Sequence, residues 1–130
     1  MAQSTEILPN GLQLLQDDRF FKLGQDSVLL SAFAKPRRNA KLLDLGCGTG
    51  ALALLVWRPD LKITGLELQD GPLDLFRQSI AANELENVTA LQGDLRQMRT
   101  LLPHGSMDYV ICNPPYFDRN AGANAPTAEK

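Results

Sequence analysis

A short stretch of the chain, Lys41 to Gly50 with the sequence KLLDLGCGTG, places an aspartate before three glycines at alternate positions. Glycines let the backbone turn sharply and let a ligand approach it without interference from a Cβ atom. Asp44 adds an acidic side chain at the same place. Together these residues predict a site for a nucleotide-like cofactor at Gly46, Gly48 and Gly50.

The elements on both sides of the glycines must position them. Leucines at 42, 43 and 45 predict a buried parallel strand. The run Ala51 to Leu55 starts a helix whose free N–H groups face the loop. In open α/β sheets, ligands bind in the crevice outside the carboxyl ends of the strands. Two alternatives stay open: a dinucleotide site, since Gly46 to Ala51 fits G-x-G-x-x-A, and a glycine turn that only packs a helix onto a sheet.

A second group of residues able to do chemistry, Asn113-Pro114-Pro115-Tyr116, follows a strand predicted over Met107 to Cys112. Two prolines cannot pair in a sheet, so they form a rigid corner. Such a corner fixes the Asn113 side-chain oxygen and the Pro114 carbonyl as two acceptors for a planar NH2 group. Holding both hydrogens lets the nitrogen attack in line, and Tyr116 offers a face on which a base stacks. The alternative is an exposed Pro-Pro turn.

Two acidic residues follow other predicted strands. Glu67 lies near the end of a strand over Leu61 to Leu68, where a carboxylate accepts hydrogen bonds from both hydroxyls of an adenosine ribose. The alternative is a solvent-facing glutamate. Asp94 follows a strand over Val88 to Gln92. It either accepts from the exocyclic amine of an adenine or caps a short helix over Arg96 to Leu101.

The composition limits the other classes of function. The 130 residues are 44% hydrophobic and 22% charged, as expected for one soluble domain long enough to bury a core. The formal net charge of −2 gives no general affinity for a phosphate backbone. Without a membrane-length apolar run or a signal-peptide pattern, we expect a cytoplasmic protein that does not enter membranes. Two cysteines and one histidine do not make a metal set, so no metal is predicted.

The remaining segments predict the rest of the fold. Leu12 to Gln16 and Arg19 to Lys22 form a hairpin around Asp17-Asp18, and a helix capped near Ser27 runs to about Ala34. The basic cluster before the central strand, residues 35–38, contacts RNA or is a solvated loop. A helix from Pro72 to about Asn83 completes an alternation of strands and helices, which predicts one α/β domain with a mostly parallel sheet. We expect residues 1–10 and 118–130 to be flexible, because they bury little.

Asp44 to Gly50 together with Asn113 to Tyr116 resembles the class I S-adenosylmethionine-dependent methyltransferases that methylate amino groups. The segment Phe21 to Leu30, FKLGQDSVLL, makes the chain similar to the bacterial tRNA adenine-N6 methyltransferases that modify A37 of a valine tRNA. The resemblance runs from about Gly11 to Phe117. It implies a Rossmann-like fold, S-adenosyl-L-methionine as the cofactor, tRNA as the partner and methyl transfer to an exocyclic amine.

The resemblance also implies a role for each matching residue. Asp44 and the glycines form the loop on the methionine side, Glu67 binds the ribose and Asp94 lies on the adenine side. Asn113 to Tyr116 form the catalytic corner, and the segment around Gly24 to Ser27 closes over the methyl donor. The implied cofactor-binding residues are Gln25, Asp26, Ser27, Asp44, Gly46, Cys47, Gly48, Thr49, Gly50, Glu67, Leu68, Gly93, Asp94, Leu95 and Asn113.

The chain departs from this family after the catalytic corner, where family members continue and this sequence soon ends. We therefore expect an incomplete sheet, with C-terminal strands absent. The strand before Asn113 then has a bare edge with which a second chain would pair. We expect the 130-residue chain to keep its cofactor contacts but to methylate poorly or not at all.

The two motifs leave other functions open. They also occur in glutamine-N5 methyltransferases of peptide release factors, and closely similar ones occur in guanine-N2 rRNA methyltransferases, since each presents a planar amine to Asn113. From a different class, the chain is a noncatalytic nucleotide-binding or assembly module. A nicotinamide dehydrogenase is the weaker alternative, because it gives no role to Asn113 to Tyr116.

Overall fold

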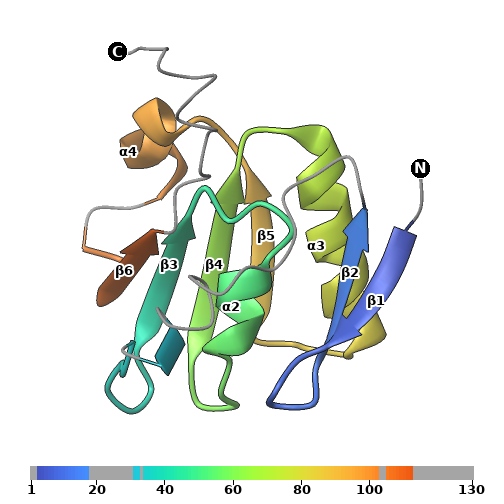
Figure 1. The fold of residues 1–130 in the computed structure, drawn as a ribbon. Helices are drawn as coiled ribbons and strands as arrows, with labels where there is room; N and C mark the ends of the chain where they lie inside the picture. The colour runs from blue at the N-terminus through green and yellow to red at the C-terminus, as the bar shows by residue number, and fades with distance from the viewer. Residues whose placement is uncertain (1–2, 18–30, 33, 103–104, 113–130) are drawn as a thin grey trace, which may run out of the picture.

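The computed structural model describes residues 3–17, 31–32, 34–102 and 105–112 (Figure 1). One parallel sheet of four strands has the order β5-β4-β3-β6. Its strands are β3 (Lys41–Leu45), β4 (Lys62–Glu67), β5 (Val88–Gln92) and β6 (Tyr109–Cys112). The helical segments between them are α2 (Ala51–Leu55), α3 (Asp70–Ala82), η1 (Leu95–Gln97) and α4 (Met98–Leu101). The prediction of a Rossmann-like α/β fold with a mostly parallel sheet is confirmed.

Strand β3 lies inside the sheet and is covered on both faces. Its side chains alternate, so that Leu42 and Asp44 face the core around α2 while Leu43 faces the opposite side. All three are at most 2% exposed. A short leucine-rich run is typical of a parallel strand with two buried faces, as the sequence predicted.

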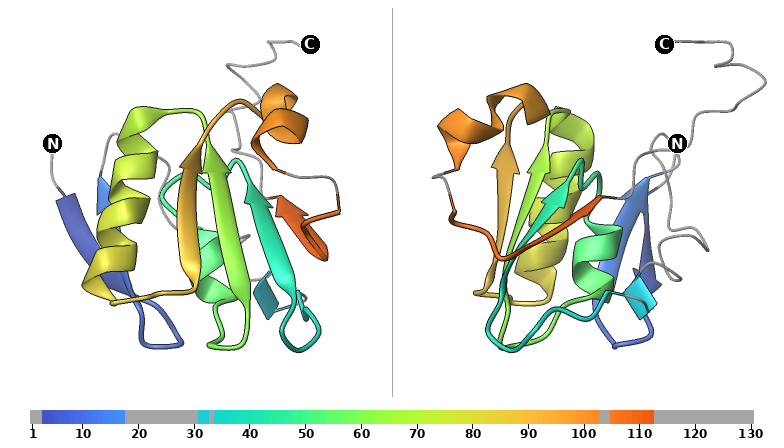
Figure 2. Two further views of the ribbon diagram at one scale, coloured as in Figure 1. Left: turned by 180° about the vertical axis from the view of Figure 1, so that it is seen from behind. Right: turned by 90° about the vertical axis from the view of Figure 1, so that its left-hand side faces the viewer.

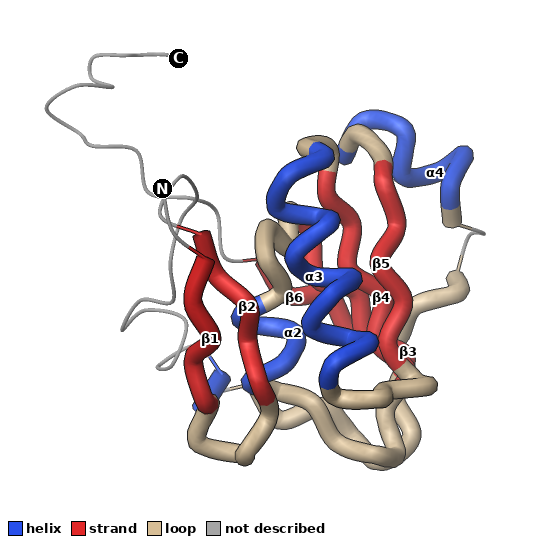
Figure 3. Tube along the Cα trace, turned by 90° about the vertical axis from the view of Figure 1, so that its right-hand side faces the viewer, coloured by secondary structure: helices blue, strands red, loops and turns tan. Residues whose placement is uncertain are grey.

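Helices α2 and α3 lie between the sheet and a separate N-terminal hairpin, as the side view in Figure 3 shows. Helix α3 packs against β5 on one side and against strand β2 (Gln13–Asp17) of the hairpin on the other. Figure 2 shows α4 on the opposite side of the sheet from α2, near the carboxyl ends of the strands. The main apolar core therefore lies between the sheet and the two helices, where Phe76 is fully buried.

The hairpin forms, but with a different partner strand from the one predicted. Strand β2 pairs antiparallel with β1 (Gln3–Ile7), within the segment expected to fray. All five residues of β1 are exposed, so its pairing depends on backbone hydrogen bonds and not on buried side chains. The expected second strand, residues 19–22, lies outside the described residues.

Polar contacts attach the hairpin to α3. The backbone N–H of Leu15 donates to Ser79 Oγ at 2.9 Å. The Asn83 amide accepts from the Gln13 N–H and donates to the Gln13 carbonyl, both at 2.8 Å. Because Leu14 between them is fully buried in the core, β2 is fixed by both apolar and polar contacts.

Other element boundaries differ little from the predicted ones. Helix α3 begins at Asp70, two residues before Pro72, and the expected helix after Asp94 is split into η1 and α4. Of the predicted helix ending near Ala34, the described residues Ser31 and Ala32 are helical. Within the described ranges, the helices are too short or too polar to span a bilayer.

Candidate functional site

The strand order creates a crevice at the carboxyl ends of the strands, which we call the carboxyl edge of the sheet. From β3 the chain moves to β4 and β5 on one side, and then returns to place β6 on the other side of β3. In parallel α/β sheets, ligands bind outside the carboxyl ends of the strands where the order reverses in this way. Leu45 pairs with both Leu66 and Cys112, so β3, β4 and β6 end at the same level.

The loop after β3 presents its backbone to open space at two of its three glycines. Gly46 and Gly48 have φ of +63° and +57°, which favours glycine. A Cβ atom added at either would meet no atom within 4 Å. Gly50 differs, because an added Cβ would lie 2.1 Å from the Phe76 ring. The first two glycines thus leave room for a ligand, while Gly50 allows α3 to pack closely.

The Glu67 carboxylate is fixed beside this loop. Its Oε1 accepts the backbone N–H of Gly48 at 2.8 Å, and its Oε2 accepts the backbone N–H of Gln69 at 3.0 Å. A carboxylate has about four lone-pair positions, so each oxygen keeps capacity for another donor. A half-buried acceptor held in this position fits the two hydroxyls of a ribose, and it is not the freely solvated glutamate of the alternative interpretation.

Asp44 is the second carboxyl group at the loop and is almost completely buried, at 1% exposure. Its Oδ2 has no hydrogen-bond partner among the described residues. Burial raises the pKa of Asp44 from 3.8 to about 7, an effect opposed by the Ala53 backbone N–H and reinforced by the charge of Glu67. An unsatisfied buried acceptor beside an open glycine loop fits a ligand that brings a hydrogen-bond donor or a positive charge.

The other two loop residues, Cys47 and Thr49, turn their side chains into the protein, where they are 8% and 5% exposed. The Cys47 N–H donates to the Leu66 carbonyl at 3.0 Å, and its carbonyl accepts the Gly50 N–H at 2.9 Å. Burial raises the pKa of the Cys47 thiol, which therefore stays protonated. Cys47 holds the loop on β4. Because the side chains of Cys47 and Thr49 are both buried, a contact from either residue to a cofactor would come from the backbone.

Residues after β4 and β5 form the far side of the crevice. Leu68 follows Glu67 and is 59% exposed, which gives an apolar surface for a planar ring. Gly93 continues the pairing of β4 and β5 through its N–H to the Glu67 carbonyl, at 3.0 Å. A Cβ on Gly93 would lie 2.2 Å from Leu101, so this glycine has a packing role under α4.

Asp94 is engaged by its own neighbour. Its carboxylate accepts the Arg96 backbone N–H at 2.9 Å and the Arg96 guanidinium at 2.6 Å. These hydrogen bonds lower the pKa of Asp94 to about 2. Of the two predicted roles, the cap of the short helix is therefore present, and the contact to an adenine amine stays a prediction.

Several predicted site residues lie outside the described part of the chain. They are Gln25, Asp26, Ser27, Asn113, Pro114, Pro115 and Tyr116, together with the side chain of Leu95. The described residue that precedes the predicted catalytic corner, Cys112, ends β6 beside β3.

The Ala53 backbone N–H group, which contacts Asp44, belongs to the helix whose free N–H groups were predicted to face the loop. Sequence reasoning did not find two other groups that shape the crevice, the Gln69 backbone N–H group and the Phe76 ring. Backbone donors carry no residue signal. Phe76 lies within the helix predicted from Pro72 to about Asn83, but its contact with the glycine loop depends on how that helix packs.

The reversed strand order, the glycine loop and the carboxylates at the ends of β3 and β4 define a class I methyltransferase fold of the Rossmann-like type. The chain belongs to the methyltransferase small domain family, whose model matches residues 24–128.

Solved structures show the same fold. The Thermus thermophilus 16S rRNA N2 G1207 methyltransferase, in complex with AdoMet and guanosine, matches 90% of this chain and 33% of its own, with a TM-score of 0.69 and 22% identity. The Pyrococcus abyssi tRNA (uracil-54, C5)-methyltransferase, in complex with S-adenosyl-L-homocysteine, matches 87% of this chain and 28% of its own, with a TM-score of 0.67 and 16% identity.

Curated relatives are more similar in sequence. The tRNA1(Val) (adenine(37)-N6)-methyltransferase of Pseudoalteromonas translucida is 35% identical over 79% of this chain and 44% of its own length. The enzyme of the same name from Yersinia pestis is 32% identical over 74% of this chain and 40% of its own length. The chain thus matches less than half the length of these relatives.

Proposed function

We propose that the chain is the cofactor-binding part of an S-adenosyl-L-methionine-dependent N-methyltransferase that acts on adenine N6 of a tRNA. The observation that carries the proposal is the Glu67 carboxylate, fixed by the N–H groups of Gly48 and Gln69 beside an open glycine loop. The substrate comes from the names of the curated relatives, which are tRNA adenine-N6 methyltransferases. A tRNA substrate implies a cytoplasmic location.

The residues of the crevice fit the parts of this cofactor. Glu67 accepts from the ribose hydroxyls, and the backbone at Gly46 and Gly48 allows close approach of the methionine part. The unsatisfied Oδ2 of Asp44 accepts a hydrogen bond from the cationic methionine end. Leu68 covers one face of the adenine. When bound, the cofactor supplies an electrophilic methyl group on a positively charged sulfur.

The catalytic part of the proposal depends on Asn113, Pro114 and Tyr116, which lie outside the described residues. The Asn113 side-chain oxygen and the Pro114 carbonyl accept the two N–H groups of the target amine and orient its nitrogen. Tyr116 stacks against the base, which must leave its own stack to reach the site.

A calorimetric titration with S-adenosylhomocysteine, with NAD in parallel, tests the cofactor assignment. We expect S-adenosylhomocysteine to bind, and we expect Glu67→Ala to weaken binding by about 1–3 kcal/mol because the ribose hydroxyls lose their acceptor. Glu86→Ala is the matched control, since Glu86 is an exposed glutamate before β5 at the opposite edge of the sheet. Binding of NAD in place of S-adenosylhomocysteine would overturn the proposal, as would equal affinities for the two variants.

The substrate is tested separately, by transfer of a labelled methyl group to a tRNA transcript and to a peptide release factor. Label in the tRNA supports the proposal, and label only in the release factor contradicts it. We expect slow transfer by the 130-residue chain, because it matches less than half of the length of its relatives.

A further inference from the structure

The amino-terminal ends of β3 and β4, at the edge opposite the glycine loop, carry a concentrated group of cations. Six of the 13 Lys and Arg residues of the chain lie in its segments 35–41 and 58–62. They are Lys35, Arg37, Arg38, Lys41, Arg58 and Lys62, and we call them the amino-edge surface. The adjoining acidic residues are Asp60 and Asp108, so this surface has a surplus of 6 − 2 = 4 positive charges in a chain of net charge −2.

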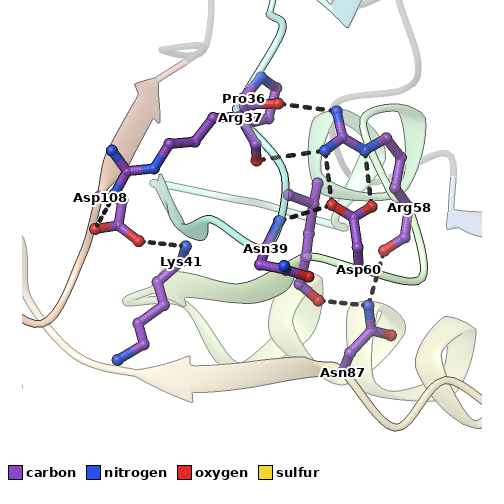
Figure 4. Close-up of polar contacts among 9 residues, drawn as sticks. Pro36, Arg37, Asn39, Lys41, Arg58, Asp60, Asn87 and Asp108 are labelled. Atoms are coloured by element: carbon purple, nitrogen blue, oxygen red, sulfur yellow. Dashed lines mark hydrogen bonds and ion pairs between the residues drawn. The ribbon is translucent and has the colours of Figure 1, made fainter.

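Hydrogen bonds hold this surface in one shape (Figure 4). The Arg58 guanidinium donates to the carbonyls of Pro36 at 2.9 Å and Arg37 at 3.4 Å. It also donates to both carboxylate oxygens of Asp60, at 3.0 and 2.8 Å. Asp60 in turn accepts the backbone N–H of Asn39 at 2.8 Å. The loop before β3 is thus attached to the turn before β4.

Asp108 makes the equivalent connection from β6 to β3. It accepts the backbone N–H of Lys41 at 2.9 Å, and its other oxygen lies 3.0 Å from the Arg37 guanidinium. The two acidic residues of the surface are therefore engaged with Arg58 and Arg37. They do not neutralise the remaining four cations.

Those four cations, Lys35, Arg38, Lys41 and Lys62, are exposed. Their side chains make no hydrogen bond or ion pair with any residue that the structure describes. Lys41 and Lys62 are direct neighbours in the register of β3 and β4, where two like charges repel unless an anion binds. The nearby acidic residues Glu84 and Glu86 precede β5, on the side of β4 away from β3 and β6.

We infer that the amino-edge surface binds the phosphate backbone of a folded RNA. These exposed cations lack partners among the described residues, and they lie on strand ends and on a loop whose backbone is fixed by hydrogen bonds. The backbone therefore loses little conformational freedom when they bind phosphate, and they act through charge regardless of sequence. In a chain of net charge −2, such a surface attracts a polyanion through its local surplus of positive charge.

The two edges of the sheet set the size of the RNA. A strand of five or six residues spans roughly 15–20 Å, so the amino-edge surface lies about that far from the crevice. One RNA that reaches both edges must extend over at least this distance. The inference rests on the proposed function for the identity of the RNA as the tRNA substrate, with its target adenine at the carboxyl edge.

The test is the salt dependence of binding between a fluorescent tRNA transcript and the chain. Lys35→Gln/Arg38→Gln lowers the net charge by two, and both side chains lack described partners. The control Arg77→Glu also lowers the net charge by two, at an exposed site on α3. We expect the double variant to reduce the slope of log K against log salt by about 1.5–2 and to weaken binding roughly tenfold or more, with the control close to wild type.

The same proteins are then titrated with S-adenosylhomocysteine, which separates this inference from the proposed function. We expect both variants to bind it as wild type does, because the crevice is at the other edge. Equal salt slopes for the double variant and the control would overturn the inference while leaving the cofactor site intact. Binding to anionic phospholipid vesicles but not to tRNA would also overturn it. If wild type does not bind S-adenosylhomocysteine, the proposed function is contradicted but the binding of RNA at the amino-edge surface is not.

Discussion

The carboxyl groups at the amino edge of the parallel sheet differ from those at its carboxyl edge in their hydrogen bonding. At the amino edge, Asp60 and Asp108 each face an arginine and accept backbone N–H groups, so their hydrogen bonding is satisfied. At the carboxyl edge, Asp44 is buried with one oxygen that has no partner among the described residues, and Glu67 accepts hydrogen bonds from two backbone N–H groups. The first arrangement stabilises a turn, whereas the second keeps acceptor capacity for a ligand.

The comparison is not simply one of position, because Asp94 also lies at the carboxyl edge and is engaged with Arg96. What distinguishes a candidate ligand group is an acceptor without a nearby cation, in a place where water is excluded or limited. Asp44 meets this condition in full and Glu67 in part. Their environments therefore identify the crevice independently of any motif.

The largest effect on stability is expected in the glycine loop, where it distinguishes a glycine needed for packing from one that leaves room for a ligand. Gly50→Ala puts a Cβ 2.1 Å from the Phe76 ring at a φ of +90°, and we expect a loss of about 3–5 kcal/mol of stability. Gly48→Ala meets no atom within 4 Å and suffers only the positive φ, so we expect a loss of about 1 kcal/mol. Urea denaturation of both variants measures the difference.

The same two variants should differ in the opposite sense in their ligand binding. Gly48→Ala places a methyl group on the side of the loop that faces open space. We expect it to weaken the binding of S-adenosylhomocysteine by more than its small effect on stability suggests. If both alanines destabilised the chain equally, the assignment of Gly50 to packing would be wrong. Phe76→Leu in the Gly50→Ala background provides the control, since a smaller side chain relieves the clash.

The glycine pattern could be read from the sequence, but the separate reason for each glycine could not. Gly46, Gly48 and Gly50 occur at regular spacing, yet only the position of α3 decides that the third faces Phe76. Tertiary contacts of this kind connect residues far apart in the chain. Gly50 thus has the packing contact expected by the alternative interpretation, while the first two glycines face open space. A contact from any of the three to a cofactor stays a prediction.

The prediction of the strands from the sequence is limited in the same way, because tertiary contacts decide part of the pairing. The buried strand β3 was predicted from its leucines, and β5 (Val88–Gln92) has the predicted bounds. Strand β1 was missed because its five residues are exposed and polar or isolated apolar, so no period of burial indicates a strand. Its pairing depends on the turn at residues 8–12 and on the fixed position of β2 against α3.

The next effect concerns the pH dependence of stability at the carboxyl edge. Burial holds the pKa of Asp44 at about 7 in the folded chain, compared with 3.8 in the unfolded chain. Between these values the folded state binds more protons, so stability falls as the pH rises. Asp44→Asn removes this fall. Relative to wild type, we expect it to gain stability from pH 4 to pH 8, by at most about 4 kcal/mol.

Urea titrations of wild type and Asp44→Asn at several pH values provide the measurement, since carboxyl groups other than Asp44 and its neighbour Glu67 contribute equally to both proteins. A difference that is constant with pH would contradict a buried, proton-holding Asp44. In the same variant, S-adenosylhomocysteine affinity should fall at pH 8, because a neutral amide replaces the carboxylate that faces the cationic methionine end.

The smallest effect is expected at the amino edge, with the opposite sign. Hydrogen bonds from the Arg58 guanidinium and the Asn39 N–H lower the pKa of Asp60, so its contribution to stability is present at neutral pH and lost as the pH falls below its unfolded value. Asp60→Asn removes this contribution. We expect a slightly lower melting temperature at pH 7 and a smaller further decrease between pH 5 and pH 2 than in wild type, because a partly exposed ion pair contributes little.

Thermal denaturation of wild type, Asp60→Asn and the exposed control Glu86→Gln over this pH range measures the effect. The control should follow wild type, since Glu86 is exposed and shows no hydrogen bond or ion pair within the described part of the chain. If Asp60→Asn instead gained stability with rising pH, as expected for Asp44→Asn, the carboxyl groups of the two edges would not differ in kind. If the two variants change in stability with pH in opposite directions relative to wild type, the carboxylates of the amino edge serve to fix the loop that carries the amino-edge surface. At the carboxyl edge, the buried Asp44 would then lower stability, as expected where a ligand supplies the missing hydrogen-bond partner.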